Sequence, residues 1–140
     1  MVGRYALQKL GASLLPKDLH YLAYVASTDE AYVTDSQRDI IYLNANGHPF
    51  FQQVWEMEQK NIGETASPQA LLELTAFDYI QHLRNGFWLD AYGDEFNIKF
   101  LVRTFHLEGV KVINNHVQAD ELAIIEKVIA SAKRSPLTPN

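Results

Sequence analysis

The sequence predicts an α+β fold, in which an antiparallel sheet built from a hairpin and a three-stranded meander has helices on one face and at both ends. Three observations support this fold. Residues 31–44 contain two β-rich runs around a polar turn, and residues 68–84 place apolar side chains at helical spacing. From Phe87 onward the apolar period changes to that of a strand.

Composition limits the class of protein. The chain has 140 residues, of which 47% are hydrophobic, so it is long enough for one compact domain. A formal net charge of −5 with scattered Lys and Arg argues against binding to nucleic acid. The absence of cysteine excludes disulfides, thiol chemistry and Cys-ligated zinc. Polar residues interrupt the apolar N-terminus, which predicts neither a signal peptide nor a membrane span, and hence a cytoplasmic protein.

The first 29 residues are expected to form an N-terminal helical flank. Residues 4–15 place three leucines at helical spacing, and residues 17–27 favour a helix over a strand. The hairpin follows, with strands at Ala31–Thr34 and Ile40–Leu43 joined by Asp and Ser turn chemistry.

Two helices are predicted next. Pro49 suits the first turn of a helix through Met57, whose apolar stripe includes Phe51 and Trp55. A long helix begins near Pro68 after the N-cap residue Ser67 and ends before Asn85-Gly86.

Strands at residues 87–92, 96–107 and 110–113 are expected to complete the meander, because Phe96, Ile98, Phe100 and Val102 alternate with polar residues. A C-terminal helix is predicted at residues 118–133, within a segment from 115 to 134. The tail, residues 135–140, is expected to be disordered.

The order and lengths of these elements resemble PAS sensor domains over about residues 30–114. The best local match is Asp39-Ile40-Ile41-Tyr42-Leu43-Asn44, and Tyr92-Gly93-Asp94-Glu95-Phe96 is similar to the turn before the family's long strand. The resemblance implies a sensory or regulatory domain that binds a small molecule or a partner and signals through terminal helices as a homodimer. It implies no catalytic residues, and the sequence contains no nucleophile or phosphate-binding motif.

The cofactor is not identified by the sequence. Without cysteine, the covalent flavin adduct of light-sensing relatives is excluded. The helix end around His82 looks like the position of the proximal histidine in some haem-binding relatives, so His82 is a candidate haem ligand. The alternative, which we favour, is a surface pair between His82 and Asp78 at i,i+4 spacing.

A set of largely aromatic residues could line a ligand cavity between helices and sheet, although filling the core is the commoner use of such residues. The candidates are Tyr42, Phe51, Trp55, Phe77, Trp88, Phe100 and Arg103.

The last helix has an apolar seam of heptad type, which could pair with a second chain or pack on its own domain. The seam consists of Leu122, Ile125, Ile129 and Ala132.

A second hypothesis also fits the acidic charge, the small size and the absence of catalytic motifs. In that hypothesis the chain is a small acidic inhibitor of another protein, such as an antitoxin or immunity protein, and it holds no ligand.

Overall fold

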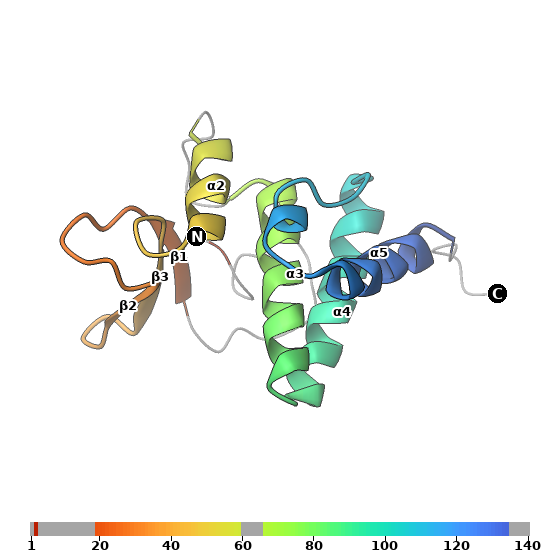
Figure 1. The fold of residues 1–140 in the computed structure, drawn as a ribbon, viewed down its shortest axis with the longest axis horizontal. Helices are drawn as coiled ribbons and strands as arrows, with labels where there is room; N and C mark the ends of the chain where they lie inside the picture. The colour runs from red at the N-terminus through yellow and green to blue at the C-terminus, as the bar shows by residue number, and fades with distance from the viewer. Residues whose placement is uncertain (1, 3–18, 60–65, 135–140) are drawn as a thin grey trace. The chain divides into compact units, whose positions relative to one another are not determined.

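The computed structural model describes residues 2, 19–59 and 66–134. Within these residues the fold is α+β, with a three-stranded mixed sheet and four α-helices (Figure 1). Contacts divide the chain into two compact units, residues 1–71 and 72–140, with the boundary inside helix α3 (Pro68–Arg84). The boundaries expected from the sequence, after residues 29, 114 and 134, stay predictions. The predicted helix at residues 4–15 and the tail at 135–140 lie outside the described residues.

The predicted hairpin is confirmed. Strand β2 (Tyr32–Asp35) is antiparallel to β3 (Ile40–Asn44). In the turn, the Asp35 carboxylate accepts a hydrogen bond from the Arg38 N–H at 3.3 Å. Asp39 has a φ of 57°, a left-handed conformation that Asp tolerates better than most residues. The polar residues that indicated a turn therefore form it.

The helix favoured at residues 17–27 is wrong, because Leu19–Ala23 form strand β1. Strand β1 pairs in parallel with β3, with Leu19 opposite Ile40, so the sheet order is β1-β3-β2 and the sheet is mixed rather than antiparallel. Pairing with a distant strand stabilises β1 as a strand, although its own sequence also suits a helix.

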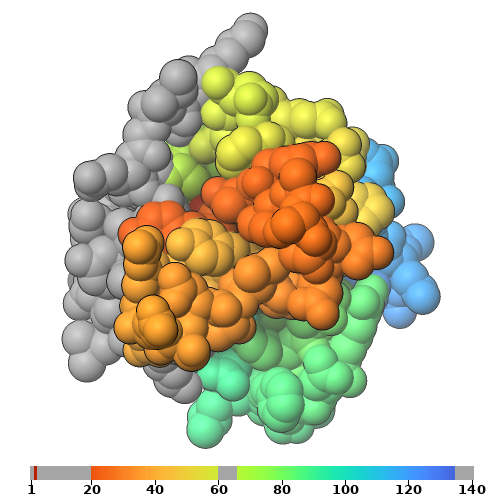
Figure 2. All heavy atoms as spheres, turned by 90° about the vertical axis from the view of Figure 1, so that its left-hand side faces the viewer, coloured from red at the N-terminus to blue at the C-terminus, as the bar shows by residue number. Residues whose placement is uncertain are grey.

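Asn44, at the end of β3, fixes the connection between β1 and β2. Its side-chain amide donates to the carbonyls of Val25, Thr28 and Glu30 at 3.3, 3.2 and 2.9 Å. Its side-chain oxygen accepts from the N–H groups of Val25 and Asn46 at 2.8 and 3.0 Å. Figure 2 shows this connection, in red-orange, lying against the hairpin. A fully buried side chain thus holds a loop that has no regular backbone pairing of its own.

Gly47 lies against the backbone of the same loop at Glu30 and Ala31. Gly47→Ala should therefore lower the free energy of unfolding by about 2 kcal/mol or more. A Cβ at this position would stand 2.2 Å from the Glu30 carbonyl oxygen and 2.6 Å from the Ala31 nitrogen, both backbone atoms. Denaturant unfolding measures the change. Gly109→Ala is the control, because among the described residues, its chain neighbours apart, no atom lies within 4 Å of the added Cβ. Equal stability of the two variants would contradict this account of the loop.

Helix α2 (Pro49–Met57) lies beside the sheet in the first unit and confirms the predicted helix (Figure 1). The His48 side chain caps it, because Nδ1 accepts the Phe50 N–H at 3.1 Å. Phe50, Phe51 and Val54 are buried, as the apolar stripe indicated.

Two further predicted helices are confirmed as α3 (Pro68–Arg84) and α5 (Ala119–Arg134). The Ser67 hydroxyl oxygen accepts the Ala70 N–H at 3.2 Å, as expected of an N-cap residue. Helix α4 (Trp88–Phe105) runs beside α3 after a short turn at Gly86, and α5 packs against α4 (Figure 1).

The expected meander is wrong, because residues 88–105 form the single helix α4 and residues 110–113 form no strand. Its buried apolar residues Ala91, Ile98, Leu101 and Val102 follow helical spacing. Of the four residues whose alternation predicted a strand, Ile98 and Val102 are buried in the helix, whereas Phe96 and Phe100 are not. A short 3-10 helix, Ile113–Asn115, follows the loop after α4.

Glu73, fully buried on α3, fixes this loop from the inside. Its carboxylate accepts the backbone N–H groups of Lys111, Val112 and Ile113 at 2.6, 3.1 and 2.9 Å. Three successive N–H groups that converge on one anion form a nest, which compensates the desolvation of the charge. Glu73 therefore joins α3 to the segment between α4 and α5.

Candidate functional site

The outer face of α4 carries large apolar side chains that remain exposed. Leu89 is 90% exposed, Tyr92 73% and Trp88 66%, and Phe87 and Phe96 are also exposed. Spacings of three and four residues between Leu89, Tyr92 and Phe96 place them on one stripe of the helix. We call these five residues, Phe87, Trp88, Leu89, Tyr92 and Phe96, the aromatic surface.

The opposite face of α4 is buried and contains polar groups. Asp94 is only 4% exposed, and its Oδ2 lies 2.5 Å from Nδ1 of His82 on α3. Asn97 is also buried, and its Oδ1 has no hydrogen-bond partner in the described part of the chain. Besides its buried apolar residues, the helix therefore buries two polar groups and leaves aromatic side chains exposed, and both features depart from the usual pattern. Local rules are most often broken at functional sites.

A shallow hollow of about 180 Å³ adjoins the aromatic surface between α3 and α4. Trp88 and Tyr92 form one side of it, and Tyr79 of α3 belongs to the other. Burial raises the pKa of the Tyr79 phenol, and the carboxylates of Glu95 and Asp94 raise it further. The hollow is thus lined by aromatic rings and lies in the negative electrostatic potential of nearby carboxylates. Its lining consists of Tyr79, Leu83, Trp88, Ala91, Tyr92 and Glu95.

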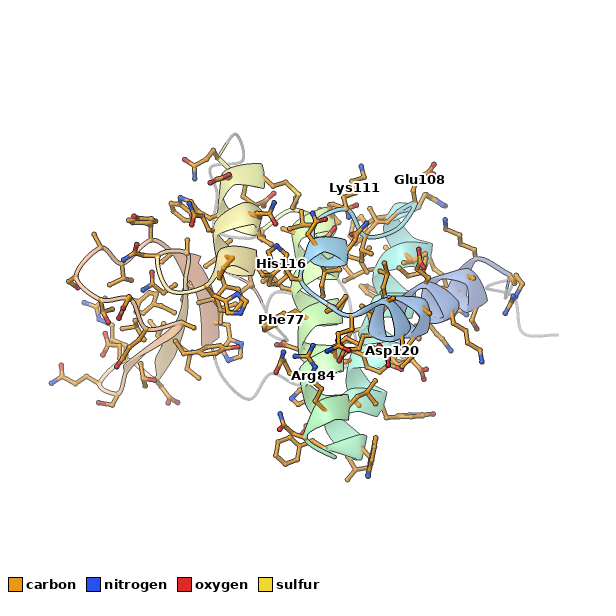
Figure 3. The ribbon with its side chains drawn as sticks, viewed as in Figure 1. Phe77, Arg84, Glu108, Lys111, His116 and Asp120 are labelled. Carbon is orange, nitrogen blue, oxygen red and sulfur yellow. The ribbon has the colours of Figure 1, made fainter. Side chains whose placement is uncertain are left out.

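Arg84 anchors the end of α3 to the start of α5. Its Nε and Nη2 donate to the two carboxylate oxygens of Glu121, both at 2.6 Å. Figure 3 shows Arg84 directed towards the first turn of α5, where Asp120 also lies. The hydrogen bond from Arg84 is the main cause that lowers the pKa of Glu121, and Glu121 in turn raises the pKa of Arg84.

This pair predicts a pH-dependent contribution to stability. A lowered folded-state pKa means that the unfolded chain binds the proton more tightly, so the contribution is present above the ordinary pKa of 4.5 and is lost below it. At neutral pH, Glu121→Gln should cost less than about 1 kcal/mol, because Arg84 is largely solvated. Thermal unfolding from pH 7 to pH 3 tests this, and the two proteins should converge in acid. A difference that does not change with pH would refute the assignment.

Two larger hollows lie near the ends of α4 and α5, with volumes of about 350 and 410 Å³. Both include Glu108 and Lys133. The cations at these hollows contact backbone carbonyls: Arg103 Nε donates to Ala132 at 3.2 Å and Lys133 Nζ donates to Glu108 at 2.5 Å. Ala132 lies in the last turn of α5 and Glu108 in the loop after α4, so each of these two cations satisfies a backbone carbonyl, which accounts for its presence without a ligand.

The candidate cavity residues are divided between the two units. Tyr42, Phe51 and Trp55 belong to the first unit, and Phe77 and Phe100 lie on α3 and α4 of the second. Trp88 and Arg103 line two different hollows. Phe51 and Phe77 are buried, which agrees with the alternative that such residues fill the core.

The apolar seam of α5 is used inside the second unit. Ile125, Ile129 and Ala132 are buried there, and Leu122 is partly buried, while α5 packs against α4. The sequence left open whether the seam pairs with a second chain or packs on its own domain. In the structure it packs on its own domain.

The His82 ring pairs with the buried carboxylate of Asp94, whereas the pair favoured from the sequence was with Asp78. The role of His82 as a haem ligand stays a prediction. Among the described residues no group of three or more His, Asp or Glu side chains could hold a metal ion. A carboxylate beside an imidazole orients the ring.

The aromatic surface as a unit was missed by the sequence analysis. The signal was present, because Trp88, Leu89, Tyr92 and Phe96 have helical spacing, but the alternating segment after Phe96 outweighed it. Trp88 alone was identified as a site residue.

Comparison with other proteins gives no family. No protein-family model matches the chain, and neither a curated protein nor a solved structure matches it. The described helices include none with the length and apolar character needed to span a membrane.

Proposed function

We propose that this chain is a small acidic protein-binding module, and that the aromatic surface of α4 is its binding face. The main support for this proposal is that Trp88, Leu89 and Tyr92 are exposed on one side of the helix. Leaving large apolar side chains in water is unfavourable, and contiguous patches of them mark interaction sites. Trp and Tyr are also the residues that contribute most to binding energy at interfaces.

The partner that fits this face is an amphipathic protein segment with apolar anchors and basic residues. The anchors would cover the aromatic surface. The basic residues complement a chain with a net charge of −5 and a pI near 5.4. Glu95 lines the adjoining hollow, and no ion pair involving Glu95 is found within the described ranges.

The geometry supports this function better than that of a PAS-like sensor. The sensor hypothesis depended on a meander at residues 87–113 that would close a ligand cavity against the helices, and most of this segment is helix α4. The hairpin and the helices at 49–57 and 68–84 remain compatible with either function. Binding through α4 requires no cofactor and no catalytic residue, so we propose a protein that is not an enzyme.

Selection from a displayed library of random linear peptides tests the function. The immobilised chain is the target, and the double variant Trp88→Ala/Tyr92→Ala is used for counter-selection. We expect enriched peptides to combine large apolar residues with Lys or Arg, and to lose binding to the double variant. Ile124→Ser, which alters an exposed apolar residue of α5, is the matched control and should bind them normally.

Two results would contradict the proposal. The first is enrichment of peptides that bind the double variant and the wild-type chain equally. The second is a stable dimer of the purified chain, measured by light scattering, that the double variant dissociates. In that case a second copy of the chain, rather than a different protein, would cover the aromatic surface.

A further inference from the structure

We propose that the hollow beside the aromatic surface receives the guanidinium group of an arginine side chain from the partner. This inference rests on the proposed function and identifies the group that gives the partner its specificity. The hollow combines aromatic side chains from two helices, Tyr79 from α3 and Trp88 and Tyr92 from α4, with the carboxylate of Glu95. These are the two kinds of group that attract a cation in a protein site.

The size of the hollow selects the class of ligand. Pockets for cofactors and other small molecules usually occupy about 300–1,000 Å³. The hollow has about 180 Å³, below that range. It is therefore suited to the head of one side chain rather than to a whole cofactor.

Its chemistry favours a planar cation. Trp88 and Tyr92 are four residues apart on α4, so their side chains project from the same face one turn apart. A guanidinium group can stack on an aromatic ring while it donates hydrogen bonds to a carboxylate, which a compact ammonium does less well. Leu83 and Ala91 complete the lining with apolar surface.

The electrostatics of the site agree with a cation. Glu95 and Asp94 both act on the Tyr79 phenol by raising its pKa, so negative potential reaches the hollow. Helix α3 ends and α4 begins at this corner, and the opposed end dipoles of two helices partly cancel. The nearest arginine in sequence, Arg84, is already held by both oxygens of Glu121.

A titration with small probes tests the hollow without the partner. In the variant Trp55→Phe, Trp88 is the only tryptophan, so its fluorescence reports on the hollow. The probes are N-acetyl-arginine amide and its neutral isostere N-acetyl-citrulline amide. We expect saturable quenching by the arginine probe in the millimolar range, with at least about fivefold weaker binding of the citrulline probe.

Charge variants in the same Trp55→Phe background locate the interaction. Glu95→Gln should weaken binding of the arginine probe by about threefold to tenfold, whereas Lys99→Gln, on the next turn of α4, should not weaken it. Equal binding of the two probes, or an unchanged affinity in Glu95→Gln, would overturn the assignment.

Peptide selection and probe binding are separate measurements. Peptides without arginine that still need Trp88 would leave the binding module standing, and a failed selection would not alter the probe result.

Discussion

Glu73→Gln should lower the free energy of unfolding by about 3 kcal/mol or more. The buried carboxylate accepts three backbone N–H groups from residues 111–113, and hydrogen bonds to a charged group each contribute about 1.5–3 kcal/mol. Glutamine keeps one oxygen but places an NH₂ group against N–H donors. At least one buried donor is then left without an acceptor. The loop after α4 should detach from α3 as a consequence.

Denaturant unfolding and hydrogen exchange of the amides at residues 111–113 measure this effect. We expect the midpoint to fall, and these three amides to lose protection under native conditions. Glu126→Gln is the control, because it makes the same chemical change on the exposed side of α5 and should alter stability by less than about 0.5 kcal/mol. Similar stabilities for the two variants would rule out the nest as a main structural element.

Trp88→Ala should weaken binding of a peptide selected on the chain by about 30-fold or more, the effect of losing about 2 kcal/mol at an aromatic anchor. The free energy of unfolding should change by less than about 1 kcal/mol, because the side chain is 66% exposed. Isothermal titration and thermal unfolding of the same samples separate these effects. A variant that loses stability and affinity together would indicate a structural residue instead.

Local signals were sufficient for much of the fold. The turn residues Asp35 and Asp39 marked the hairpin, Ser67-Pro68 marked the start of α3, and the 3.6-residue spacing of Ile125 and Ile129 marked α5. In each case the residues that carry the signal also make the stabilising contact in the structure. Such elements are determined mainly by their own sequence.

Strand β1 could not be assigned in this way. Leu19–Ala23 has side chains that suit either a helix or a strand, and it becomes a strand through parallel pairing with β3, about twenty residues away. Parallel partners are distant in sequence, so the segment itself holds no turn signal that indicates the pairing.

Helix α4 was missed for a physical reason that also concerns function. Periodicity analysis assumes that apolar residues face the core, whereas α4 exposes Trp88, Leu89 and Tyr92 and buries Asp94 and Asn97. Because α4 has apolar residues on its exposed face as well as on its buried face, its hydrophobic pattern no longer indicates one buried stripe. The exposed apolar residues that caused the error also support the proposed binding face.

The buried polar pairs were not predictable from sequence spacing. In the sequence, Glu73 is about forty residues from the amides whose hydrogen bonds it accepts, and His82 is twelve residues from Asp94. Only the packing of α3 against later segments brings these groups together. Trp88 was identified because it is aromatic and has a polar N–H group, but nothing in the sequence indicated that it would be exposed.

Mapping the binding face by NMR tests the central claim most directly. A selected peptide is added to ¹⁵N-labelled protein, and the shifts of the backbone amides are followed. We predict that the largest changes fall on the end of α3 and the first half of α4, residues 79–96, and that Trp88→Ala abolishes them. Changes confined to residues 19–59, or to the exposed side of α5, would contradict the account.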